Sequence, residues 1–180
     1  MMHAPQPPHT SAITHIAMVM LYSVLCAALF GALHDQLSYS VSPEYFTLLK
    51  FQQFHLTEWA LPLRLKAALV GVLATWWVGL PLGLALGVAT SRWYGAQAQA
   101  VFWRLLPWLL LAVSGGALLG LGYGYWQTNE LHQFAGKRLP FGLQDVRGYL
   151  MVGIMHKAAY LAAGLVLPFV LLLLYWRRPR

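Results

Sequence analysis

The sequence predicts an all-α protein, a bundle of four transmembrane helices with an extra interfacial helix between the first and second spans. Hydrophobic residues make up 59% of the chain and charged residues only 9%, whereas about a quarter of the residues in a soluble globular domain are charged. Apolar runs of roughly 20 residues, the length that a helix needs to cross a bilayer, recur along the chain. We therefore expect a single integral membrane domain over residues 1–180.

Four apolar runs are the expected spans. They cover about residues 12–33, 65–90, 101–125 and 149–176. Pro81 lies inside the second run and should kink it around Trp77, because a proline ring crowds the carbonyl group of the residue four positions earlier.

A polar stretch, residues 34–55, separates the first two runs. Within it, Ser42, Pro43 and Glu44 form a helix-start signal, with serine as the N-cap, proline at the first helical position and glutamate in the first turn. The residues that follow carry a broad, largely aromatic apolar face but are too few to span a bilayer. We expect a helix over about residues 43–55 that lies along the membrane surface.

Glycines recur at every fourth position in the second and third expected spans. This spacing places each set on one helix face, where missing side chains let two backbones approach closely. We expect the two sets to pack against each other in a close hairpin; a homodimer seam or a lipid groove is the alternative. The helix-packing glycines are Gly79, Gly83 and Gly87 in the second span and Gly116, Gly120 and Gly124 in the third.

Side chains of metal-ligand type converge at one expected depth. Counting about 20 residues from the inner ends of the spans places His34 and Asp35 near the outer end of the first span and His156 near that of the fourth. Glu44 comes from the helix start beside them. Imidazole and carboxylate are ligands for zinc, iron and copper. The sequence therefore predicts an outward-facing metal site formed by His34, Asp35, Glu44 and His156, with a single haem held by the two histidines as the alternative.

Other functions stay open at this point. No local metal motif fixes the four residues, and hydrogen bonds or ion pairs at headgroup level explain them without any ligand. The chain could be a small accessory subunit of a larger respiratory or photosynthetic membrane complex, or a homo-oligomer. It could also be a membrane enzyme or quinone-binding protein at the outer interface, with His34 or His156 as general base and Asp35 orienting it.

The basic residues point to membrane headgroups, with no nucleic acid as partner. The formal net charge is +7, but the lysines and arginines are scattered at helix ends and form no basic face. Arg177, Arg178 and Arg180 crowd the C-terminus, and Arg92 and Arg104 flank the short loop between the second and third spans. This local density favours cytoplasmic termini.

The run His34-Asp35-Gln36-Leu37-Ser38-Tyr39 is followed by Ser42-Pro43-Glu44-Tyr45-Phe46-Thr47 and by Lys50-Phe51, Gln53 and Phe54. Together with a His-x-x-x-Tyr pattern at His156 and Tyr160, these stretches resemble a signature of a family of uncharacterised bacterial four-span integral membrane proteins. The resemblance implies a four-helix architecture and a location in the bacterial inner membrane. It brings no activity with it.

Overall fold

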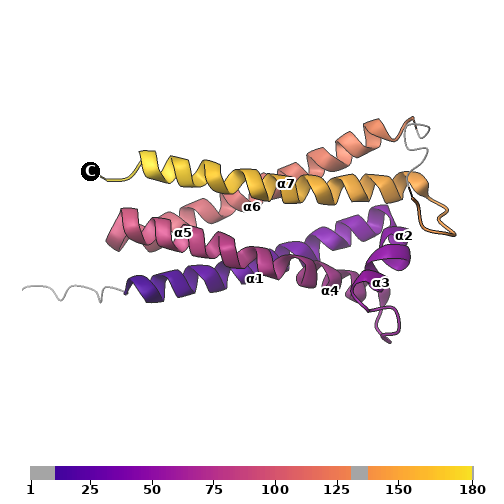
Figure 1. The fold of residues 1–180 in the computed structure, drawn as a ribbon, viewed down its shortest axis with the longest axis horizontal. Helices are drawn as coiled ribbons and strands as arrows, with labels where there is room; N and C mark the ends of the chain where they lie inside the picture. The colour runs from indigo at the N-terminus through magenta and orange to yellow at the C-terminus, as the bar shows by residue number, and fades with distance from the viewer. Residues whose placement is uncertain (1–10, 131–137, 180) are drawn as a thin grey trace, which may run out of the picture.

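The structure, a computed structural model, describes residues 11–130 and 138–179. Every regular element within these two segments is a helix, so the all-α prediction is confirmed (Figure 1). In chain order the elements are α1 Ala12–Val41, α2 Pro43–Tyr45, the π-helix η1 Phe46–Lys50, α3 Phe51–Gln53, α4 Leu63–Thr75, the 3-10 helix η2 Trp76–Val78, α5 Gly79–Tyr94, the 3-10 helix η3 Gly95–Gln97, α6 Ala98–Gln127 and α7 Val146–Trp176.

Three helical stretches among the described residues are long and apolar enough to cross a membrane. They are Ala12–Val41, Leu63–Gln127 and Val146–Trp176. The middle stretch reverses direction between α5 and α6, which run in opposite directions in Figure 1. Gly95 lies at the reversal with a φ of 50°, a left-handed backbone conformation that glycine adopts without a steric penalty.

The first long helix continues further than its apolar run. The sequence predicts a span that ends near Leu33, but α1 continues to Val41. In this extension the hydroxyl groups of Ser38 and Ser40 donate to the carbonyl oxygens of His34 and Gln36, at 3.0 and 2.9 Å, so both hydroxyl groups find partners within the helix. This extension places the polar stretch against the other helices instead of in a loop.

The predicted helix start at Ser42 is confirmed. Ser42 Oγ accepts a hydrogen bond of 3.4 Å from the backbone N–H of Tyr45, and Pro43 occupies the first turn of α2. The chain then passes through one π-helical segment, in which the N–H of Phe51 bonds the carbonyl oxygen of Phe46. Together α2, η1 and α3 form a short helical segment, here called the cap helix, over residues 43–53.

The aromatic face of the cap helix points into the protein. Tyr45, Phe46 and Phe51 are buried, and Phe46 has no exposed surface at all. They pack in one cluster with side chains of α4 and α7, among them Val70 and Val152. Figure 1 shows α2 and α3 at one end of the long helices. The aromatic residues therefore serve the interior of the bundle.

The expected kink in the second apolar run coincides with a change of helix type. Between α4 and α5, residues Trp76–Val78 form a 3-10 helix. Pro81 lies in the first turn of α5. Proline is tolerated at this position because the N–H groups of a first turn have no partner within their own helix. Beside this break, Thr75 Oγ1 donates to the carbonyl oxygen of Ala27 at 2.7 Å and so ties α4 to α1.

The glycines do bring helices together, but the expected pairing between them is wrong. Gly79, Gly83 and Gly87 face α1 and not α6. A β-carbon added at Gly83 would lie 2.6 Å from the Cα atom of Met20, and one added at Gly87 would lie 3.1 Å from that of Ile16. The α1 and α5 backbones therefore lie in direct contact.

The second set of glycines faces α7. A β-carbon at Gly116 would collide with Ala162, one at Gly120 would lie 3.3 Å from the Cα atom of Met155, and one at Gly124 would lie 3.1 Å from that of Met151. The bundle thus consists of two tight units, α1 with α4–α5 and α6 with α7. Spacing of four identified the contact faces correctly but could not identify the partner helix.

Neighbouring glycines of α6 allow a matched test of this packing. The Gly120→Ala change should destabilise the protein by about 1–3 kcal/mol, because the new methyl group meets the side chain of Ala158 and a packed interface resists an added carbon. The Gly122→Ala change meets nothing within 4 Å and should be neutral or slightly stabilising, since alanine favours a helix. Denaturant titration in mixed micelles measures both variants, and equal stabilities would contradict the glycine contact.

Candidate functional site

His34 and Asp35 on α1 meet His156 on α7. One ligand-type atom from each residue lies within 4.8 Å of the other two. His156 Nε2 is 3.6 Å from Asp35 Oδ1, and the rings of His34 and His156 meet edge to face with centroids 4.7 Å apart. Asp35 is only 2% exposed. The structure therefore brings together three of the four predicted ligands, here called the His/Asp trio.

Residues one turn away on α1 hold the trio in place. Phe30, four residues before His34, stacks on its ring with a centroid distance of 5.4 Å. Ser38, four residues after His34, is fully buried, and its Oγ atom lies 3.1 Å from His156 Nε2. Residues four positions apart lie on the same face of a helix, so the spacing in the sequence predicts both neighbours. For Ser38 this prediction holds only if α1 continues past Leu33, which the apolar run does not indicate.

The cap helix covers the trio. The ring of Tyr45 lies 5.2 Å from that of His156 and the ring of Phe46 lies 6.5 Å away, centroid to centroid. Burial lowers the pKa of the nearby Lys50 ammonium group, while the negative charge of Asp35 acts in the opposite direction. Burial likewise raises the pKa of the Tyr45 phenol. Both shifts reflect an environment from which water is largely removed.

Two atoms of the trio have unmet bonding capacity. Among the described residues, His34 Nε2 and Asp35 Oδ2 are buried and have no hydrogen-bond partner. A buried polar group without a partner costs about 1–3 kcal/mol, and more when it is charged. Such atoms in a native fold need an explanation, and a catalytic role, a bound water or a bound ion each provides one.

A cavity of about 120 Å³ opens beside the trio. His34, Asp35 and His156 line it at one end, and Ser23, Leu86, Leu106 and Val166 line it further along the bundle. It therefore lies between the two tight helix units. The hydroxyl group of Tyr160 donates to the carbonyl oxygen of Ala74 at 3.1 Å, a bond between two further lining residues that joins α7 to α4.

Glu44, the fourth predicted ligand, is not part of this group. Its carboxylate accepts hydrogen bonds from the backbone N–H groups of Gln144, at 3.0 and 3.2 Å, and of Asp145, at 2.7 Å. Asp145 is in turn the N-cap of α7, accepting from the N–H of Gly148 at 2.8 Å. Glu44 therefore fixes the start of α7 to the cap helix, and so helps to position His156. Its place in the first turn of a helix pointed to a structural role.

The same geometry weighs against two alternative chemistries. Ser38 and Asp35 both approach Nε2 of His156, whereas a Ser-His-Asp triad needs the serine and the aspartate on opposite ring nitrogens. A haem bound between His34 and His156 would need a gap for its macrocycle, and the edge-to-face contact of the two rings fills that space.

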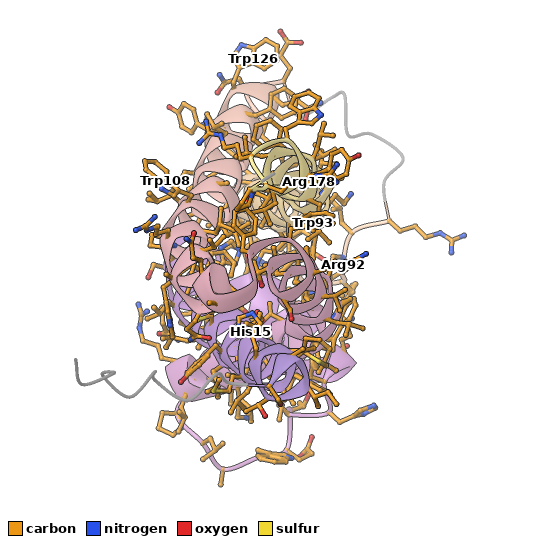
Figure 2. The ribbon with its side chains drawn as sticks, turned by 90° about the vertical axis from the view of Figure 1, so that its left-hand side faces the viewer. His15, Arg92, Trp93, Trp108, Trp126 and Arg178 are labelled. Carbon is orange, nitrogen blue, oxygen red and sulfur yellow. The ribbon has the colours of Figure 1, made fainter. Side chains whose placement is uncertain are left out.

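His15 forms a separate polar contact near the other end of α1. Its Nε2 atom lies 2.9 Å from Thr90 Oγ1 and its Nδ1 atom lies 3.2 Å from Gln99 Oε1. Figure 2 views the bundle from this end, with Trp108 and Trp126 on the outer side of α6. Because both ring nitrogens of His15 have partners, this contact reads as a tie between helices.

No protein-family model, curated protein or solved structure matches the chain. The likeness to bacterial four-span proteins therefore stays a prediction.

The role of Glu44 can be separated from metal ligation. The Glu44→Ala change should destabilise the protein by about 1–3 kcal/mol, because the N–H groups of Gln144 and Asp145 lose a charged acceptor, and should leave metal binding unchanged. The matched control Glu58→Ala removes an exposed carboxylate and should change stability by less than about 0.5 kcal/mol. Denaturant titration and metal analysis measure the two effects. Loss of bound metal in Glu44→Ala at unchanged stability would reverse this assignment.

Proposed function

We propose that this protein binds one divalent transition-metal ion through His34, Asp35 and His156. The observation that carries the proposal is the pair of unpartnered buried atoms, His34 Nε2 and Asp35 Oδ2, within a group of three ligand-type side chains. An ion would satisfy both atoms at once. Binding would draw the three ligand atoms closer together by rotation of their side chains.

The ligand set favours zinc or ferrous iron. Two imidazoles and one carboxylate form the donor set of many catalytic sites for these metals, in which three protein ligands leave a further position free for water or substrate. The negative charge of Asp35 would neutralise one of the two positive charges of the ion. The aromatic rings of the cap helix beside His156 limit the access of water.

The membrane arrangement that accompanies this proposal has four spans. The stretch Leu63–Gln127 counts as two spans because the chain reverses at Gly95, and the cap helix then lies at the interface beside the trio.

Basic side chains at the end of the bundle that carries the trio form hydrogen bonds within the protein. Lys66 Nζ donates to Thr57 O at 2.9 Å, and Arg147 donates to Asn129 Oδ1 at 2.6 Å.

Arg92, Arg177 and Arg178 lie near the other end of the helices, with the termini. By local density of positive charge we place that end in the cytoplasm and the trio on the outer side. With the four-span likeness, this gives a multi-pass protein of the bacterial inner membrane whose partner is the lipid bilayer.

Metal analysis of the full-length protein in nanodiscs tests the site. After loading and desalting, we expect close to one zinc or ferrous ion per chain, and less than about a tenth of that in His34→Ala, Asp35→Asn and His156→Ala, because three donors are needed for tight binding. Zinc should also raise the melting temperature of the wild type. The zinc effect should fade as the pH is lowered, because protons compete with the ion for its ligands.

The His55→Asn variant is the matched control. His55 is exposed, lies outside the trio and has a φ of 57°, a conformation that asparagine tolerates. Its metal content should equal that of the wild type. Equal zinc content in Asp35→Asn and the wild type, or wild-type protein that retains neither metal, would disprove the proposed site.

A further inference from the structure

We infer that a groove between α5 and α7 binds one anionic phospholipid, with an acyl chain along α5 and the phosphate group at Arg92 and Arg178. The groove lies toward the end of the bundle that carries the termini, away from the trio, and the inference is independent of the proposed metal site. It is carried by the length of the groove, its apolar wall and the positive charge at one end.

The groove follows one face of α5 and has a volume of about 460 Å³. Its lining residues on this helix recur every three or four positions, a spacing that places side chains in one stripe along the helix axis. Leu171 lines the groove from α7. The stripe on α5 consists of Pro81, Leu84, Ala85, Val88, Ala89 and Arg92. The groove therefore runs lengthwise along a membrane-spanning helix.

The length of the groove matches one leaflet of a bilayer. At about 1.5 Å per residue, α5 rises about 16 Å from Pro81 to Arg92, and half of a hydrocarbon core of about 30 Å is about 15 Å. The volume of about 460 Å³ is roughly three times that of a cavity of about 150 Å³ that holds benzene. One acyl chain therefore fits, with its glycerol end at Arg92 and its methyl end near Pro81.

The wall of the groove favours hydrocarbon. Leu84 and Val88 face outward and are 48% and 47% exposed, while the small side chains of Ala85 and Ala89 leave room between them. Water would find few polar partners along this wall, and an empty groove would forfeit dispersion contacts. A lipid chain from the surrounding bilayer meets both conditions.

The headgroup end of the groove carries a positive charge without an acidic partner. Arg92 is exposed in the last turn of α5. All five acidic residues of the sequence lie between Asp35 and Glu58 or between Glu130 and Asp145, at the trio end of the bundle. Basic side chains at that end donate hydrogen bonds to protein groups. An anion for Arg92 must therefore come from outside the chain.

Trp93 and Arg178 extend this end of the site. Trp93 lines the groove and meets the ring of Tyr175 edge to face, with centroids 5.7 Å apart. The guanidinium group of Arg178 lies 3.9 Å from the centroid of the same Tyr175 ring, and Figure 2 labels Arg92, Trp93 and Arg178 close together in the view from this end. Guanidinium groups bind phosphate oxygens in pairs, and tryptophan is typical of the headgroup level.

Lipid retention measured by native mass spectrometry tests the site. The full-length protein, in nanodiscs of equal parts phosphatidylglycerol and phosphatidylcholine, is released into mild detergent and weighed with its bound lipid. We expect one phosphatidylglycerol per chain, retained at least about tenfold more than phosphatidylcholine, because arginine favours an anionic headgroup. Excess inorganic phosphate should not release it. Equal retention of the two lipids, or release by phosphate, would overturn the inference.

Two arginines provide a matched pair of variants. Arg92→Gln should lower the retention of phosphatidylglycerol at least about tenfold, because the phosphate group loses a charged donor fork. Arg104→Gln removes the same charge at the same end of the bundle, from an exposed position on α6 that does not line the groove, and should retain the lipid like the wild type. Equal losses in both variants would show attraction by net charge alone and disprove the site.

Two alanines test the acyl chain. Ala85 lines the groove, so Ala85→Leu should fill it and lower retention about fivefold, because the chain loses its contacts with α5. Ala112 is exposed on α6 and is not among the lining residues, so Ala112→Leu should retain the lipid like the wild type. Equal retention in the two variants would contradict a chain in the groove.

The lipid site and the metal site are tested apart. The His34→Ala variant should lose zinc and keep phosphatidylglycerol, whereas Arg92→Gln should lose the lipid and keep zinc. Retained lipid in a protein that binds no zinc would disprove the metal site alone. Loss of the lipid in His34→Ala would overturn its placement between α5 and α7.

Discussion

A carboxylate buried among apolar helices is the constraint on which the rest of the structure depends. Asp35 has almost no exposed surface, and a charge in such a place needs partners within reach. His156 approaches it from another helix at 3.6 Å, and Glu44 fixes the start of that helix to the cap helix. The extended α1 and the aromatic cap helix complete the enclosure. These features have in common that they hold α7 against the polar end of α1.

The glycines determine which helices pack closely around the trio. Each set draws two helices into backbone contact, at α1 with α5 and at α6 with α7. The two units pack less tightly against each other than the helices within each unit do, and the cavity lies between the units. The glycines close the interfaces within the units, whereas among the described residues no glycine contact of this kind closes the interface at the cavity. Gly31 and Gly71, where α1 and α4 also meet backbone to backbone, extend the same principle toward the trio.

Much of this architecture could be predicted from local patterns. The helical class followed from composition, the start at Ser42 from its capping signal, and the meeting of His34, Asp35 and His156 from depth along the spans. Depth along a span says nothing about the direction in which a side chain points, so it cannot separate Glu44 from the trio. Glycine spacing identifies a face and not the helix that covers it. Polar composition alone does not reveal that α1 continues to Val41, because serine hydroxyls find partners within a helix as readily as in a loop.

The π-helical segment Phe46–Lys50 accommodates one extra residue in the cap helix. In an α-helix, residues five positions apart point in widely different directions, yet Phe46 and Phe51 are both buried in one cluster. The wider turn, closed by the bond from the Phe51 N–H to the Phe46 carbonyl oxygen, brings them into phase. Removal of one residue between the two rings would leave them four positions apart, a spacing at which an ordinary α-helix also places both side chains on one face. The π-helical turn thus lets the cap helix contain one residue more than an α-helix would, while both rings stay in the same cluster.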